Sequence, residues 1–480
     1  MTLMKSLLLG SAAGIVAVAS AQAADLPTKK AAPAAADYVK ICHITAFGTT
    51  YDGFVVPGSD TCLKLFGGLS GEFTLVNLKD QFHATPFTAA GVAIAPGTVP
   101  VAGDTLGQIN YGHGSQAVPS VLATRDNFEM GYRAYIGFDA VSNTAYGPLA
   151  AEIQINDNGN TSSNGGPGGS NNLSAYATGN SVSLDHAWLK WAGLEVGAAT
   201  SLYDLGNGGG WLDYPSPDPS AVALIAYTAT FGGGFSATID LEDPTDKRTN
   251  GTFGPYAANT YHGVQYPDLI AILGVTQSWG SAQIAGLLHD TKVVSGSFGD
   301  AVNKWGWGLN AAVSVNIPGL GAGSAFTVQG AYSYAVIKGA GFNSTPLYTY
   351  GGGFAGNGAD AMLSDAVDLG GGVWSYPSTW TIGANLKLVL SPQISITPEL
   401  AYGHVHYNNS PLWLTQTVSG WFGGAHANWD PVTNLDFQLD LMYASLHEST
   451  PVGTAALPVA AGWQDNSNGF YGRLAITRKF

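Results

Sequence analysis

The chain has 480 residues, but only 11% of them are charged, against the roughly 25% that is usual in soluble domains. Glycine contributes 65 residues, and the formal net charge is −15. A polytopic helical membrane protein is excluded, because no run of about 18 apolar residues follows the N-terminal segment. The acidic total argues against nucleic-acid binding, since no basic stripe is present to displace phosphate counterions. Few charges, much glycine and many aromatic residues are typical of numerous short strands in contact with an apolar phase.

The N-terminus has the features of an export signal. Lys5 precedes an apolar run over residues 7–19, and an Ala-Gln-Ala tripeptide ending at Ala23 has the small-x-small form that signal peptidases cut. We therefore predict a signal peptide over residues 1–23, with cleavage between Ala23 and Ala24.

Two short regions follow before the first long strand. Residues 24–37, which are rich in Ala, Pro and Lys, are predicted to be a flexible periplasmic extension. Residues 38–62 contain both cysteines of the chain, Cys42 and Cys62. In an oxidising compartment we expect them to form one disulfide, which stabilises a loop of this size by about 3 kcal/mol. Two free thiols are the alternative.

The remainder of the chain, residues 63–480, repeats one kind of segment. Apolar residues alternate with small or polar residues, which is the period of a strand and not of a helix. Segment 305–316 is typical, because Trp305, Trp307 and Leu309 alternate there with small or polar residues. Such segments suit tilted strands that span a membrane. They are predicted at 63–76, 128–139, 148–157, 182–191, 193–202, 222–231, 234–242, 268–279, 282–290, 305–316, 324–337, 379–390, 392–404, 416–429, 433–446 and 468–480.

The connections between these segments alternate between short turns and long loops. The short ones hold turn-forming Gly, Pro or Asn residues. The long ones are polar and glycine-rich, at 77–127, 158–181, 203–221, 243–267, 291–304, 338–378, 405–415 and 447–467. This asymmetry is typical of outer-membrane barrels. The predicted fold is therefore all-β, a 16-stranded antiparallel transmembrane β-barrel in the bacterial outer membrane.

Tryptophans are expected to form two interfacial belts on this barrel. Trp191, Trp279 and Trp429 lie beside short turns, and Trp305 and Trp380 lie beside long loops, each on the apolar parity of its segment. Bilayer interfaces favour this arrangement. Tryptophans that cap strands in a soluble sheet are the alternative, but a soluble barrel would carry more charged residues on its outer face.

The chain ends in an aromatic residue, Phe480, which shares its parity with Ile476, Leu474 and Phe470. This pattern resembles the C-terminal signature that outer-membrane barrels present to the barrel assembly machinery. Arg478 interrupts the parity, but a charge near the interface costs only about 0–1 kcal/mol and can snorkel.

Several runs of residues point to one family. They are Asp-Tyr-Val-Lys-Ile-Cys at 37–42, Val-Pro-Gly-Ser-Asp-Thr-Cys-Leu-Lys at 56–64, Tyr-Thr-Ala-Thr-Phe at 227–231, Trp-Gly-Ser-Ala-Gln at 279–283 and Pro-Val-Thr-Asn-Leu-Asp at 431–436. Together they resemble the alphaproteobacterial porin family of rhizobial-type bacteria, over the whole mature chain. The resemblance implies a 16-stranded homotrimeric porin in which one long loop folds into the lumen as a constriction.

The chain departs from this family at the pore. The family usually has Arg in two places that read Tyr-Gly-Pro-Leu-Ala at 146–150 and Gly-Ala-Ala at 197–199 here. The basic wall of the constriction is thus depleted, and we expect cations to pass at least as easily as anions.

Candidate pore residues follow from parity and from the resemblance. The lumen-facing parity predicts charged wall residues at Lys64, Glu72, Arg133, Glu152, His186, Lys190, Glu195, Asp240 and Lys387. The third long loop, 203–221, is the constriction loop by its order in the family. It carries Asp204, Asp213 and Asp218 and no basic residue, so a transverse field is expected between loop and wall. The alternative is that these Asp residues are solvated turn formers.

Catalytic and metal sites are weakly supported. Neighbouring residues of a strand point to opposite faces, so Asp185 is not expected to orient His186 for hydrolysis. His404 and His406 share a face without a third ligand, which favours a strand-end pair in the lumen or a loop over a metal site. No cofactor is expected.

The predicted function is a passive, water-filled outer-membrane channel for small hydrophilic solutes and ions, surrounded by lipid and lipopolysaccharide. A channel specific for a sugar or an amino acid is the alternative, for which Trp188 is the one lumen aromatic that could stack on a solute. A barrel hydrolase is a remote alternative.

Overall fold

The computed structural model describes residues 40–79, 82–87, 105–110, 128–160, 182–205, 221–249, 260–295, 299–342, 363–369, 372–409, 416–449 and 466–480. The chain divides into residues 1–40 and residues 41–480, and the second unit holds all of the described strands. The predicted cleavage site at Ala23 and Ala24 lies outside the described residues.

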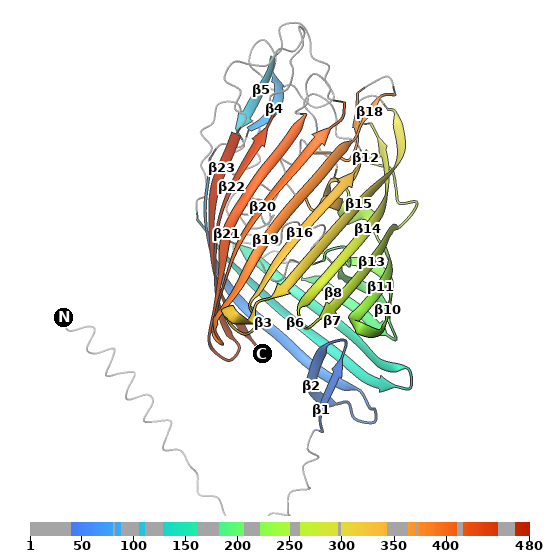
Figure 1. Cartoon of the computed structure of the whole chain (residues 1–480), viewed down its shortest axis with the longest axis vertical. Coiled ribbons are helices and arrows are strands. Elements are labelled where there is room, and N and C mark those ends of the chain that lie inside the picture. The colour runs from blue at the N-terminus through green and yellow to red at the C-terminus, as the bar shows by residue number, and fades with distance from the viewer. Residues whose placement is uncertain are drawn as a thin grey trace, which may run out of the picture. The chain divides into compact units, whose positions relative to one another are not determined.

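Sixteen antiparallel strands close into a barrel, as the sequence predicts (Figure 1). They are β3 (Cys62–Lys79), β6 (Phe128–Thr144), β7 (Gly147–Asn160), β8 (Ser183–Trp191), β9 (Leu194–Thr200), β10 (Ala221–Thr230), β11 (Phe235–Glu242), β13 (Asp268–Gln277), β14 (Gly280–Val294), β15 (Ala301–Asn316), β16 (Ala325–Tyr334), β19 (Pro377–Ser391), β20 (Ile394–Tyr407), β21 (Thr417–Val432), β22 (Leu435–Glu448) and β23 (Asn466–Lys479). The barrel closes where β23 pairs with β3. The backbone N–H of Phe480 donates to the Gly67 carbonyl at 3.0 Å, so the last residue completes the seam.

The smaller elements decorate the barrel ends. A hairpin of β1 (Ile41–Ala46) and β2 (Thr49–Val55) joins the start of β3, and β12 (Thr260–Tyr261) pairs with the end of β14. Two further pairs are β4 (Phe82–Phe87) with β5 (Thr105–Asn110) and β17 (Val367–Asp368) with β18 (Trp374–Ser375). Within the described ranges, the helices are one-turn 3-10 helices: η2 (Gly232–Gly234), η3 (Pro244–Lys247), η4 (Pro318–Leu320) and η5 (Ile337–Ala340). Across those same ranges, no helix has the length and hydropathy that a membrane span needs.

The alternation of side chains along the strands separates an outer from an inner face. On β15, Leu309 is 49% exposed on the outer face, whereas its neighbour Asn310 is 1% exposed on the inner face. Trp305 and Trp307 share the outward parity of Leu309. Because alternate residues of a strand point to opposite sides of the sheet, this register puts the apolar parity toward lipid and the polar parity toward the lumen.

The five tryptophans predicted to form interfacial belts are exposed on the outer face: Trp191, Trp279, Trp305, Trp380 and Trp429. Neighbouring aromatic rings extend both belts. The ring of Trp191 lies 5.9 Å from that of Tyr146 beside a short turn, and the ring of Trp305 lies 5.5 Å from that of Tyr266 beside a long loop.

The prediction of a long loop at 291–304 is wrong in part. The ladder between β14 and β15 continues through it up to the pair of Val294 with Ala301. Sequence periodicity missed this extension because burial does not alternate there, since Asp290, Thr291 and Val293 are all buried.

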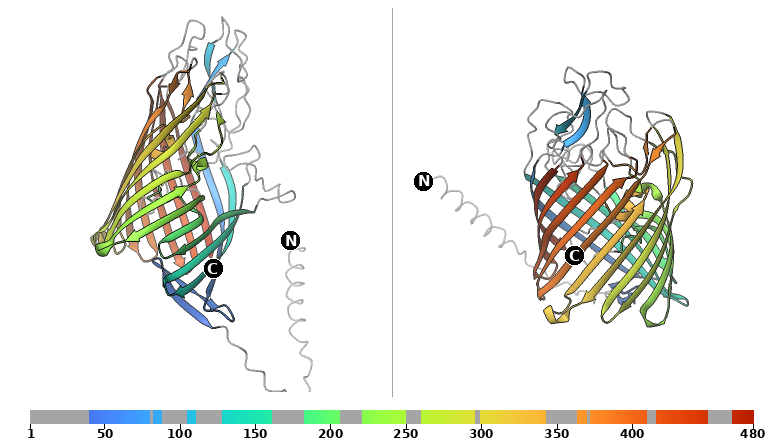
Figure 2. Two further views of the ribbon diagram at one scale, coloured as in Figure 1. Left: turned by 90° about the vertical axis from the view of Figure 1, so that its right-hand side faces the viewer. Right: turned by 45° about the horizontal axis from the view of Figure 1, so that its top comes forward.

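An apolar cluster lies inside the barrel, where a porin-like lumen is expected to be polar. Residues 335–342 and 363–369 belong to the connection between β16 and β19, and they pack against the lumen-facing side of β20–β23. We call these two stretches the inner segments. Both stretches lie between Tyr334 at the end of β16 and Pro377 at the start of β19, and Figure 2 shows the barrel strands from two further sides.

Candidate functional site

A belt of alternating charges crosses the lumen wall on β21, β22, β23 and β3. The Nδ1 atom of His426 lies 2.5 Å from Asp440, and the Nε atom of Arg473 donates to Asp440 at 2.9 Å. Arg473 also lies 3.7 Å from Glu72 on β3. Adjacent strands pair these residues directly, because His426 opposes Asp440 and Asp440 opposes Arg473 in the register. The belt therefore holds two carboxylates around one guanidinium on the wall.

The belt continues onto β6–β8. Arg133 lies 3.8 Å from Asp185, and the Gln154 side-chain amide donates to Asp185 at 2.7 Å. We name the six residues His426, Asp440, Arg473, Glu72, Arg133 and Asp185 the charge belt. Glu72 and Arg133 were predicted from parity. Asp440 and Arg473 were missed, although Asp440 follows the polar parity of its segment and could have been found.

The prediction that Asp185 faces away from His186 is wrong. The register between β7 and β8 shifts at Gln154, so that His186 pairs with Gln154 and Leu184 pairs with Ile155. This bulge leaves Asp185 without an opposing residue on β7 and turns its side chain to the same side as that of His186, whose Nδ1 lies 2.8 Å away. The contact lacks hydrogen-bond geometry at that Nδ1 atom, and Nε2 lies 3.5 Å from the Thr200 hydroxyl. An Asp-His-hydroxyl relay needs an aligned ring, which this arrangement does not provide.

The periplasmic end of the wall carries the other predicted basic residues. Lys64 lies 3.9 Å from Asp139, which opposes Glu152 across β6 and β7. Lys190 lies 3.1 Å from Glu195. Each lysine is thus paired with a carboxylate, which leaves little uncompensated positive charge there. Asp240 and Lys387, also predicted from parity, lie on the lumen-facing sides of β11 and β19.

Trp188 is the one lumen aromatic that the sequence suggested could stack on a solute, but its ring already contacts other side chains. The Lys190 ammonium lies 4.6 Å from the centre of its ring. Trp188 also packs against the apolar cluster of Ala46, Tyr51, Val141 and Ala150. A sugar that stacked on Trp188 would have to displace these contacts.

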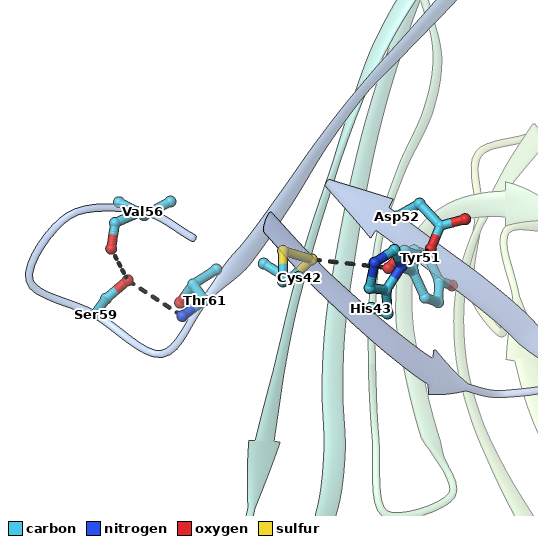
Figure 3. Close-up of a disulfide and its surroundings, with 8 residues drawn as sticks. Cys42, His43, Tyr51, Asp52, Val56, Ser59 and Thr61 are labelled. Atoms are coloured by element: carbon cyan, nitrogen blue, oxygen red, sulfur yellow. Dashed lines mark hydrogen bonds and ion pairs between the residues drawn. A yellow bond between two sulfur atoms is a disulfide. The ribbon is translucent and has the colours of Figure 1, made fainter. Parts of the chain in front are cut away.

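The disulfide between Cys42 and Cys62 is present and ties β1 to the start of β3, with the two Cα atoms 5.7 Å apart (Figure 3). The hairpin lies on the lumen side of the barrel wall, because Tyr51 packs against Val141 and Ala150. The disulfide thus holds the hairpin against the lumen-facing side of β6 and β7 at the short-turn end.

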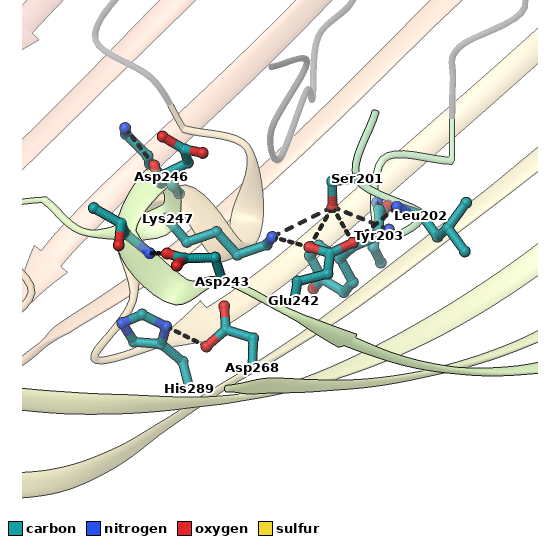
Figure 4. A network of polar contacts seen from close by, with 12 residues as sticks. Ser201, Leu202, Tyr203, Glu242, Asp243, Asp246, Lys247, Asp268 and His289 are labelled. Carbon is teal, nitrogen blue, oxygen red and sulfur yellow. Dashed lines mark hydrogen bonds and ion pairs between the residues drawn. The ribbon is translucent and has the colours of Figure 1, made fainter. Parts of the chain in front are cut away.

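The base of the third long loop turns into the lumen. Glu242 accepts hydrogen bonds from the Ser201 hydroxyl at 2.8 Å and from the Leu202 backbone N–H at 2.9 Å, and it pairs with the buried Lys247 (Figure 4). Tyr203 is fully buried, and its carbonyl accepts from the Asn310 side chain at 2.9 Å. A carboxylate that collects two donors and a lysine fixes the direction in which this loop leaves the wall.

The loop residues predicted to act in the constriction divide into two groups. Asp204 directly follows the buried Tyr203, and its backbone N–H donates to the Ser201 carbonyl at 3.2 Å. Asp213 and Asp218 lie outside the described residues. The role of all three stays a prediction.

His404 and His406 lie on the outer face, so the expectation of a pair in the lumen or a loop is wrong. Their rings stack with centroids 6.5 Å apart, and the ring of His404 lies 6.0 Å from that of Trp380 in the aromatic belt. Val405 between them is fully buried on the lumen side. Within the described part of the chain, no group of three or more side chains is arranged to hold a metal ion.

Comparisons with known proteins agree with this geometry. The sequence model of a family described as the porin subfamily matches residues 25–470. Porin Omp2b of Brucella abortus (strain 2308) is 27% identical over 412 residues, which cover 83% of this chain and 92% of that protein, and Porin Omp2b of Brucella canis is 28% identical over the same shares. The outer membrane channel DcaP of Acinetobacter baumannii has a similar fold, with a TM-score of 0.52 at 14% identity over 88% of this chain and 99% of that chain. Because the subfamily match spans nearly the whole chain, the protein belongs to the porin family and is a channel of the bacterial outer membrane.

Proposed function

We propose that this porin is a passive, water-filled diffusion channel that admits small hydrophilic solutes and ions by size and by a weak charge filter. The observation that carries the proposal is the charge belt, in which carboxylates alternate with basic groups along the wall from β21 to β8. Buried charges are retained where water or a partner compensates them, so a wall of this kind suits an aqueous lumen. A barrel of sixteen strands is wide enough to leave such a channel.

Single-channel recording of detergent-purified protein in a planar bilayer tests the proposal. We expect a linear relation between current and voltage and a conductance that rises with salt concentration. Liposomes that contain the protein should swell in sugars at rates that fall steadily with sugar size. A conductance that saturates at low salt, or swelling with one sugar only, would refute passive diffusion and favour the substrate-specific channel.

The charge filter is proposed to favour cations or to be neutral. The net charge of −15 and the pairing of Lys64 and Lys190 with carboxylates support this view. Reversal potentials across a salt gradient decide it, and a strong preference for anions would contradict it.

We further propose that three copies assemble in the membrane and that Phe480 guides assembly. The outer face of β3 and β6 supports a protein contact, because it presents Leu65, Leu69, Ile136 and Phe138 with no charged residue among them. Chemical cross-linking in native membranes should give a trimer. Deletion of Phe480, which removes two backbone hydrogen bonds to Gly67, should lower the amount of assembled barrel.

No enzymatic activity is proposed. Asp185, His186 and Thr200 come close to one another, but the His186 Nδ1 atom lacks an aligned acceptor. A chromogenic ester offered to purified channels should be hydrolysed no faster by the native protein than by the variant His186→Ala.

A further inference from the structure

We propose that the inner segments, residues 335–342 and 363–369, form a second, permanently folded-in constriction element that is distinct from the third loop. They cover the upper lumen wall of β20–β23 and restrict solutes to the charged part of the lumen. The consequences for transport rest on the proposed diffusion function, whereas the position of the segments does not.

The first support is the chemistry of the wall that the segments cover. Val405, Phe422, Met442 and Tyr471 point into the lumen from four adjacent strands and are nearly or completely buried. Their neighbours on the same strands, such as Trp421 and Leu441, point outward to lipid. Large apolar side chains gain by burial and not by contact with pore water. A wall of this composition therefore requires a permanent cover, and Phe342 and Leu363 of the inner segments supply it.

The second support is a buried carboxylate that joins three separate parts of the chain. Asp365 is fully buried and accepts hydrogen bonds from the Thr249 N–H at 2.7 Å, the Tyr261 hydroxyl at 2.5 Å and the Ile337 N–H at 2.7 Å. Its own N–H donates to the Thr249 carbonyl at 3.0 Å. Burial, together with the Asp365 charge, raises the pKa of Tyr261 well above its usual value, so the tyrosine stays a donor. Burial raises the pKa of Asp365, while the three hydrogen bonds that it accepts favour its charged form. Hydrogen bonds to a carboxylate are roughly twice as strong as those between neutral groups.

The third support is a set of anchors to the barrel wall. The Tyr407 hydroxyl donates to the Ser364 carbonyl at 2.9 Å and accepts from the Ser364 N–H at 2.8 Å. The Thr381 hydroxyl donates to the Ala340 carbonyl. Both inner segments are therefore fixed to strands that belong to the closed barrel.

The fourth support comes from two glycines on the lumen side of β15. A Cβ atom at Gly306 would lie 2.8 Å from the Ala335 carbonyl oxygen, and one at Gly308 would lie 2.6 Å from the Tyr203 hydroxyl. The wall is thus free of side chains where the inner segments and the third loop rest on it. Tyr203 in turn donates to the Gly339 carbonyl at 2.8 Å, so the two inward structures meet there.

Thiol accessibility tests the position of the segments without relying on conduction. Both native cysteines are in the disulfide, so an added cysteine is the one free thiol. We compare Val367→Cys, 3% exposed in an inner segment, with Gly319→Cys, where a side chain meets nothing within 4 Å in an exposed turn. A charged methanethiosulfonate should modify Val367→Cys at least about 100-fold more slowly, because reaction requires local opening. Rates within about threefold of each other would overturn the proposal.

Removal of the carboxylate tests the effect on the pore. In Asp365→Ala the three donors lose their acceptor, so we expect Val367→Cys to become reactive, single-channel conductance to rise by at least about 1.5-fold, and larger sugars to enter liposomes. The matched control is Asp300→Ala, since the half-buried Asp300 side chain accepts one bond from the Gly372 N–H at 3.1 Å, and it should behave as the native protein. Native conductance in Asp365→Ala together with a protected Val367→Cys would overturn the proposal.

If Asp365→Ala fails to form a heat-modifiable barrel, Gly306→Val provides the same test, because its side chain would push on the Ala335 carbonyl. The protection of Val367→Cys in the otherwise native protein still decides the position of the segments. If the native protein does not conduct at all, passive diffusion fails, whereas a protected Val367→Cys would still support a folded-in element.

Discussion

The lower and upper halves of β20–β22 face the same lumen with opposite chemistry. On β22, Asp436 and Asp440 are followed on the same parity by Met442 and Ala444. On β20, Glu399 is followed by apolar lumen-facing residues in the same way. The lower half borders the charge belt and the upper half lies beneath the inner segments. On these strands the polarity of a lumen-facing residue therefore reports whether the charge belt or the inner segments lie against it.

The largest expected effect is on stability, when a charged residue replaces an apolar residue on the upper half of β22. In Met442→Asp a charge is buried beneath the inner segments, and we expect the free energy of unfolding to fall by about 3–5 kcal/mol, as for a buried charge without compensation. Gln438→Asp places the same group four residues earlier, on the half-buried lower wall. Urea titration of both variants in lipid vesicles measures the difference. Equal losses would contradict the distinction between the two halves.

A smaller effect is expected from a change of charge within the belt. Arg473→Gln removes the cation between Asp440 and Glu72, which leaves the field at the wall more negative. The ratio of cation to anion permeability should rise about twofold, as measured from reversal potentials. Lys479→Gln removes the same charge from the same strand at the periplasmic mouth, where the lysine is half exposed. If both variants shift selectivity equally, the belt is not the filter.

The smallest effect on transport is expected from the disulfide. Cys42→Ser combined with Cys62→Ser should destabilise the β1–β2 hairpin by about 3 kcal/mol while the barrel remains closed. Limited proteolysis should cut the hairpin faster than in the native protein, and conductance should stay nearly the same. A barrel that loses its heat-modifiable form would show that the disulfide supports the barrel itself.

The barrel was predictable because each of its rules is local. Period-two alternation, turn residues and the position of Trp beside turns fix the strands and their outer face without knowledge of distant contacts. The same local rules fail at Asp185, because a single-residue bulge reverses the facing of a side chain and leaves no mark in the residue pattern.

The cover of the upper wall could not be predicted for a different reason. Parity places Val405 and Phe422 in the lumen, but it does not say which part of the chain lies over them. The glycines at 306 and 308 were visible as small residues, yet their meaning depends on Ala335 and Tyr203, which approach them from other loops. Contacts between distant loops are set by the closed barrel, and a sequence pattern within one strand does not contain them.

Site-directed spin labels on two adjacent residues of β22 test the central claim most directly. Leu439 is exposed on the outer face, and Gln438 faces the lumen below the inner segments. In vesicles, relaxation of a label at position 439 should respond to oxygen, which concentrates in lipid, and a label at 438 should respond to a water-soluble nickel complex. The reverse pattern would put lipid on the polar face of the barrel and would contradict an aqueous channel.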